Sequence, residues 1–290
     1  MAYRLKKRKP TSTDLSRIVS QEFDQAIDAI RHPGADVGVA VHEARKHVKK
    51  IRAVLRLVEK DLGKAYEVEN ERLREVAHQL ASLRDADAAA ATMKALGDHF
   101  PQLLRKSISD AFLKKFQSRQ RAAATGNGRL RQAARLLRKA ADQTSHQVGD
   151  VARRATVCGG MLRAYRRARQ ALAEVQAMPG DGVFHSWRKR VKDHWYHVRL
   201  LEGLDSHAAS RARALSHLEK CLGEDHNLVL LRGKILEDPS RFGDEKTIAL
   251  VLGCAVKYQT SLRRRALKLG KRAFARKPRV FEKTIDGWLQ

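Results

Sequence analysis

Hydrophobic residues recur at helical spacing along almost the whole chain, and no segment alternates hydrophobic and polar residues as a strand does. Ala, Leu, Arg, Lys and Glu dominate these segments, and all five favour helices. The pattern therefore predicts an all-α protein. In the first half we expect helices over residues 14–31, 36–61, 66–96, a stretch that follows Pro101 and ends before Gly126, and 130–142.

The second half repeats this plan after a junction near Gly149. We expect helices there over residues 151–177, 183–203, 207–236 and 246–275. Because the halves, about 1–147 and 148–290, have similar length and order, we predict a single domain with an internal duplication.

One segment is visibly repeated. V-H-E-A-R-K-H-V-K-K-I-R-A-V-L-R-L begins at Val41, and F-H-S-W-R-K-R-V-K-D-H-W-Y-H-V-R-L begins at Phe184. Aligned without a gap, seven of the seventeen positions are identical. On a helical wheel, the basic residues of each segment fall within an arc of about 120° beside an apolar arc. We call these residues the basic stripes: His42, Arg45, Lys46, Lys49, Arg52 and Arg56 in the first segment, and His185, Arg188, Lys189, Lys192 and Arg199 in the second.

The stripes have two possible interpretations, a solvated helix face or an anion-binding surface. A solvated face usually mixes signs, because like charges three or four residues apart repel each other. The first stripe has no acid on its own arc, and we expect Glu43 to point elsewhere. Anion binding is therefore the favoured interpretation. Trp195, which stands where the first segment has Arg52, is the one break in the pattern.

The total charge agrees with an anionic partner. The chain has 59 Lys and Arg against 32 Asp and Glu, a net charge of +27, which favours nucleic acid, an anionic membrane or a polymeric phosphate. The longest apolar run, residues 248–256, is too short to cross a bilayer. Residues 1–9 are basic without an apolar stretch, so we expect no signal peptide and a cytoplasmic location.

The role of the other ionisable residues stays open. His42 and His185 are either structural or able to gain a proton when phosphate approaches. We expect no metal site, because no further ligand stands at suitable spacing on that helix face. Residues 83–87 (L-R-D-A-D) resemble residues 223–227 (G-E-D-H-N). Their acids either form salt bridges to the stripes, the favoured interpretation, or do acid/base work.

These motifs together resemble the CHAD family, the conserved histidine α-helical domain. The resemblance rests on the twin H-x-x-R-K-x-V-K segments, the L-R-D-A-D and L-G-E-D-H-N elements, Y-R-R-A-R from Tyr165 and A-F-A-R-K-P from Ala273. It implies two four-helix bundles related by a pseudo-two-fold axis, with basic helices around a central groove or pore. It also implies that the stripe residues bind inorganic polyphosphate and that the protein is targeted to polyphosphate granules.

Two other functions compete with polyphosphate binding. Non-specific nucleic-acid binding is the main alternative, although the chain has no helix-turn-helix, no zinc finger and few aromatic residues for stacking. An enzyme acting on phosphate polymers is disfavoured, because there is no phosphate-binding G-x-x-x-x-G-K-[ST] loop and no acidic cluster for magnesium. We therefore predict a binding protein that needs no cofactor and does not insert into membranes.

Overall fold

The computed structural model describes residues 3–7, 11–34, 36–81, 85–122 and 127–290. These residues form helices and no strand, so the predicted all-α class is confirmed. A first group of packed helices consists of α1 (Thr11–Arg31), α2 (Val37–Leu57), α4 (Lys64–Ala81) and α7 (Asn127–Val151). A second group consists of α8 (Arg154–Ala177), α9 (Asp181–Leu200), α10 (Ser206–Glu237) and α11 (Glu245–Ala273).

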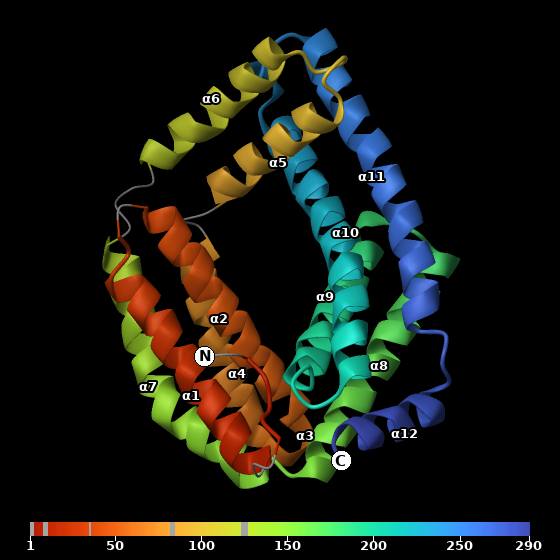
Figure 1. Ribbon diagram of the computed structural model, residues 1–290. Coiled ribbons are helices and arrows are strands. Elements are labelled where there is room, and N and C mark those ends of the chain that lie inside the picture. Colours follow the sequence, from red (N-terminus) through yellow and green to blue (C-terminus); the bar gives the residue numbers. More distant parts are fainter. Residues whose placement is uncertain (1–2, 8–10, 35, 82–84, 123–126) are drawn as a thin grey trace.

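The remaining elements connect or cover these groups. They are the short α3 (Glu59–Leu62), the paired α5 (Asp85–His99) and α6 (Lys106–Ala122), the 3-10 turn η1 (Pro239–Arg241), and α12 (Pro278–Trp288), which packs on α8. The two groups meet at one end, where α2 and α3 contact α8 and α9, and at the other end α5 contacts α10 and α11. In Figure 1 the ribbons of α2 and α9 lie close at the base and diverge towards α5 and α6. The two motif helices are therefore close at their C-terminal ends.

Local sequence explains several helix ends. Asp36 precedes α2 and accepts hydrogen bonds from the backbone N–H groups of Gly38 and Val39. Asp205 and Asp244 cap α10 and α11 in the same way. Such caps satisfy N–H groups that have no partner inside the helix. Gly63 follows α3 with a φ of 55°, a left-handed conformation that favours glycine.

Four predicted boundaries are wrong. The helix expected over 36–61 ends at Leu57 and is followed by α3, and the helix expected over 66–96 is two helices, α4 and α5, separated by residues 82–84, which lie outside the described residues. The helix expected over 130–142 is the longer α7, so the expected junction at Gly149 lies inside a helix. The sequence interpretation also missed α12.

The apolar arcs of both motif segments contribute to the core. Val48 and Ile51 of α2 and Trp187 and Val191 of α9 are all fully buried. Because these residues face the core, the rotation of each helix about its axis is fixed. The basic arc of each helix therefore lies beside its buried face. No helix within the described ranges is long and apolar enough to cross a membrane.

Candidate functional site

The stripe on α2 is directed along the neighbouring helix α4. The guanidinium of Arg45 donates to the backbone carbonyl of Ala77 at 3.1 Å, and Nε of Arg52 donates to Oδ1 of Asn70 at 3.1 Å. Burial, followed by the charge of Arg56, lowers the pKa of Arg52 to about 10, so this guanidinium still carries its charge at neutral pH. Neutral acceptors on α4 thus orient two of the stripe's cations.

Other positions of the first stripe differ in exposure. His42 and Lys49 are partly buried on α2, and Lys46 is exposed. The Lys46 amine lies 2.7 Å from Glu43. The expectation that Glu43 points elsewhere is therefore wrong, because an acid one turn away can reach back to a flexible lysine.

The first stripe ends at an ion pair that joins the two helix groups. The guanidinium of Arg56 lies 2.9 Å from Oδ1 of Asp193 on α9. Burial raises the pKa of Asp193, and the adjacent Arg56 opposes that effect. Nearby, the ring Nε2 of His197 donates to the backbone carbonyl of Ala53 at 2.8 Å. These contacts hold the C-terminal ends of α2 and α9 together.

The stripe on α9 is held by one carboxylate from α10. Nζ of Lys192 lies 2.7 Å from Oε1 of Glu219, and the Arg188 guanidinium lies 3.9 Å from the same oxygen. Lys189, the residue after Arg188, is exposed. One negative charge thus faces two positive charges, and the sequence interpretation missed Glu219 because nothing in its local sequence links it to α9.

Trp195 interrupts the basic pattern, and its ring contacts Arg199, the next cation of the stripe. The guanidinium of Arg199 lies 4.9 Å from the centre of the Trp195 ring, which suits a cation–π contact. The indole Nε1 donates to the backbone carbonyl of Ala212 at 3.1 Å, so α10 fixes the ring. The second stripe therefore has an aromatic surface where the first has Arg52.

A second histidine, His226 of α10, stacks on His185. Their ring centres are 4.1 Å apart, and the planes are inclined by 31°. Burial lowers the pKa of His226 to about 4, helped by His185, Arg188 and Lys189. Burial also lowers the pKa of His185, again followed by the charges of Lys189 and Arg188. Both rings are therefore neutral at pH 7, and an anion placed beside them would favour protonation.

The acidic element of the second half does not pair with the stripe. Asp225 is buried and accepts from Nε of Arg263 on α11 at 2.7 Å, and Asp181 also pairs with Arg263. The favoured interpretation of salt bridges to the stripes is wrong for Asp225, because that face of α10 packs on α11. In the first half, residues 83 and 84 lie outside the described residues, as do the side chains of residues 85–87.

No group of three or more His, Cys, Asp or Glu side chains suited to a metal ion occurs among the residues that the structure describes. Arg56 of the first stripe pairs with Asp193, which follows Lys192 of the second stripe in the sequence, and a basic groove between the stripes stays a prediction. The sequence interpretation missed the arginines of α8 at this junction. Of these two, Arg163 and Arg167, only Arg167 belongs to the Y-R-R-A-R run that carries the family resemblance.

The fold and the site define an all-α protein in which two basic motif helices lie in two contacting helix groups. The chain belongs to the CHAD family, since the family model for the CHAD domain matches residues 18–235. The structure resembles the crystal structure of the CHAD domain from the plant Ricinus communis, with a TM-score of 0.71, 15% identity and coverage of 96% of each chain. No curated protein sequence matches the chain.

Proposed function

We propose that this CHAD domain binds inorganic polyphosphate through the two basic stripes. The observation that carries the proposal is that neighbouring helices orient cations of both stripes and that one carboxylate is shared by two of them. A neutral amide holds Arg52, and Glu219 is shared by Arg188 and Lys192. The proposed contacts are His42, Arg45, Lys46, Lys49, Arg52, Arg56, His185, Arg188, Lys189, Lys192 and Arg199.

The chemistry of the ligand fits such a surface. Polyphosphate is a flexible thread with about one negative charge per phosphate, and stripe residues one helical turn apart are spaced by about 5.4 Å. Arginine can bind two phosphate oxygens at once, and lysine adds a compact charge. A linear polyanion can therefore follow each helix and pair with successive cations.

The proposal includes an arrangement and a cellular role. The two helix groups form one duplicated domain with a pseudo-two-fold axis, and the stripes line a central groove. The protein binds polyphosphate without degrading it and is placed on polyphosphate granules in the cytoplasm, where it acts as a targeting or scaffolding module.

Fluorescence anisotropy with labelled long-chain polyphosphate tests this function. If six or more cations contact phosphate, affinity should fall about a thousandfold between about 50 and 200 mM salt, because binding releases counterions. A chelator should leave the affinity unchanged. Binding that requires a divalent metal would contradict the proposal.

Two further measurements separate the alternatives. Unlabelled duplex DNA at equal phosphate concentration should displace polyphosphate poorly, and efficient displacement would favour nucleic-acid binding instead. Release of phosphate from the polymer in the presence of magnesium would show that the protein is an enzyme.

A further inference from the structure

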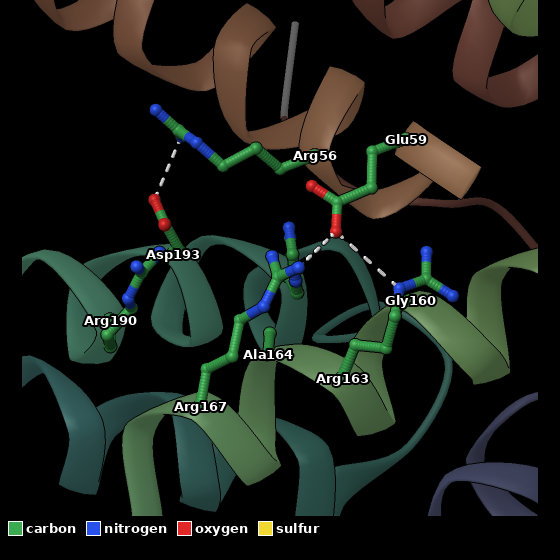
Figure 2. Close-up of a pocket in the computed structure, with 9 residues that line it drawn as sticks. Arg56, Glu59, Gly160, Arg163, Ala164, Arg167, Arg190 and Asp193 are labelled. Carbon is green, nitrogen blue, oxygen red and sulfur yellow. Dashed lines mark hydrogen bonds and ion pairs between the residues drawn. The ribbon is translucent and has the colours of Figure 1, made fainter. Parts of the chain in front are cut away.

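A small pocket lies where the two helix groups meet, and Figure 2 shows the side chains that line it. They come from α2, α3, α8 and α9. Among the described residues, the charged side chains of this junction pocket are Arg56, Arg163, Arg167, Arg190, Glu59 and Asp193. Four guanidinium groups thus face two carboxylates, which leaves an excess of two positive charges at the junction.

The four guanidinium groups differ in the ion pairs that they form. Glu59 is shared by two arginines of α8, because its Oε1 lies 2.8 Å from Arg167 and 3.7 Å from Arg163. Asp193 pairs with Arg56 at 2.9 Å. Figure 2 places Arg190 beside Asp193, yet its side chain is exposed and forms no hydrogen bond or ion pair within the described part of the chain. One guanidinium is therefore available at the rim.

A buried acceptor atom of a pocket residue also lacks a partner, and it requires a hydrogen-bond donor such as water, because phosphate oxygens are themselves acceptors. His197 lines the pocket and is 1% exposed. Its Nε2 donates to the carbonyl of Ala53, so Nδ1 is left as an acceptor, and this buried atom has no hydrogen-bond partner among the described residues. Buried polar atoms are almost always satisfied by protein, water or a ligand.

The position of the pocket connects it to the proposed polyphosphate site. Arg56 is the last basic residue of the α2 stripe, so a polyanion that follows α2 arrives at the junction. Carboxylates and phosphates bind guanidinium groups in the same two-pronged geometry, and phosphate carries more charge. Glu59 and Asp193 thus occupy the positions that phosphate oxygens would take.

We propose that the junction pocket is a subsite for a single phosphate group, in which Glu59 and Asp193 are internal anions that the ligand displaces from the arginines. This inference rests on the proposed function, because it takes phosphate as the anion. It assigns ligand contacts to Arg163, Arg167 and Arg190, outside both stripes. The two carboxylates then compete with phosphate for the arginines, and they lower the affinity of the protein for phosphate.

Removal of each internal anion tests the competition. Glu59→Gln and Asp193→Asn are compared with Asp28→Asn, which neutralises an exposed acid paired with His32 at the far end of α1 and changes net charge equally. Isothermal titration with tripolyphosphate should show about tenfold tighter binding for the two pocket variants than for the control, the equivalent of one charge-assisted hydrogen bond. Affinities of either pocket variant equal to or below that of the control would overturn the inference.

Arg190→Gln supplies a complementary test, because it breaks no hydrogen bond or ion pair within the described residues. It should weaken tripolyphosphate binding about tenfold, whereas Arg138→Gln on α7, also exposed, should have little effect. Equal behaviour of the two variants would refute a ligand contact at Arg190. Helical circular dichroism verifies that each variant is folded.

The same titrations separate this inference from the proposed function. If the wild-type protein fails to bind long polyphosphate but tripolyphosphate binding responds to the pocket variants as expected, the function proposed above is wrong and the phosphate subsite stands. If long polyphosphate binds and the pocket variants behave like their controls, only the subsite is wrong.

Discussion

The α9 stripe offers a direct test of whether a defined site or net charge governs binding. Arg188 and Lys192 share Glu219, and each keeps 20% of its side chain exposed. Both are therefore reachable by ligand and partly desolvated. We choose Arg188→Gln with Lys192→Gln, because glutamate at these positions would gather three carboxylates and endanger the fold.

The structure sets the size of the expected effect. A hydrogen bond to a charged group contributes roughly 1.5 kcal/mol at the lower end of its range, so two such contacts amount to about 3 kcal/mol, or about a hundredfold in affinity. The double variant also leaves Glu219 without its cations. Its repulsion of phosphate is on the order of 1 kcal/mol, so adding Glu219→Gln should recover roughly fivefold.

The assay is a binding isotherm with labelled polyphosphate at fixed salt. The matched control is Arg138→Gln with Lys139→Gln, two exposed residues of α7, which removes the same charge outside the stripes. The control should lose less than about fivefold, as expected for a general electrostatic effect. Equal losses in the two double variants would refute the site, since net charge alone would then explain binding.

Two further predictions concern stability. Burial lowers the pKa of His197 to about 4, so between pH 6.5 and 4 the unfolded chain takes up its proton before the folded protein does, and this histidine should cost about 2 kcal/mol of stability at pH 5. Urea unfolding at pH 7 and pH 5 should therefore show a smaller loss for His197→Gln than for the wild type, and equal losses would contradict the reasoning. Gly160→Ala should lower stability by about 1–3 kcal/mol, because its Cβ would lie 1.9 Å from the backbone oxygen of Leu57. In the neighbouring control, Gly159→Ala, the nearest atom would be 3.6 Å away, so thermal melting should show no loss or a small gain.

The stripes could be predicted because burial and charge follow the same helical period. Once Val48, Ile51 and Val191 are placed in the core, the rotation of α2 and α9 is fixed and the basic positions share one side. Helix ends were harder, since they depend on packing partners that are distant in sequence. The sequence predicts a junction near Gly149, but this residue lies inside α7, where a Cβ would approach the Ser16 side chain of α1 to 3.3 Å. Its role there is close packing.

The missed helix α12 illustrates a different limit. Pro278 stands at its first position, and Phe281, Ile285 and Trp288 are buried along one face. This spacing is helical, and proline favours the first turn of a helix. The sequence thus contains the signal, but a helix of 11 residues gives a weak periodic pattern on its own.

Sequence periodicity could not predict which acids pair with the stripes. The positions of these acids bear on the predicted duplication. The gapless alignment pairs Arg56 with Arg199 and Asp193 with Lys50. A two-fold relation would therefore place Arg199 near Lys50, at the position equivalent to the Arg56–Asp193 ion pair. Both cations do lie near one ring, that of Tyr3, at 5.6 and 5.5 Å from its centre.

The Arg56–Asp193 contact and the Arg199–Lys50 contact thus differ in their chemistry. One is an ion pair across the junction, and the other is a pair of like charges that both lie near the Tyr3 ring, with Lys50 paired with Glu22 at 2.9 Å. This reciprocity supports the duplication. Under the predicted duplication, Asp193 stands where the other repeat has Lys50, so the acid that pairs with Arg56 in the junction pocket has no counterpart at the equivalent position.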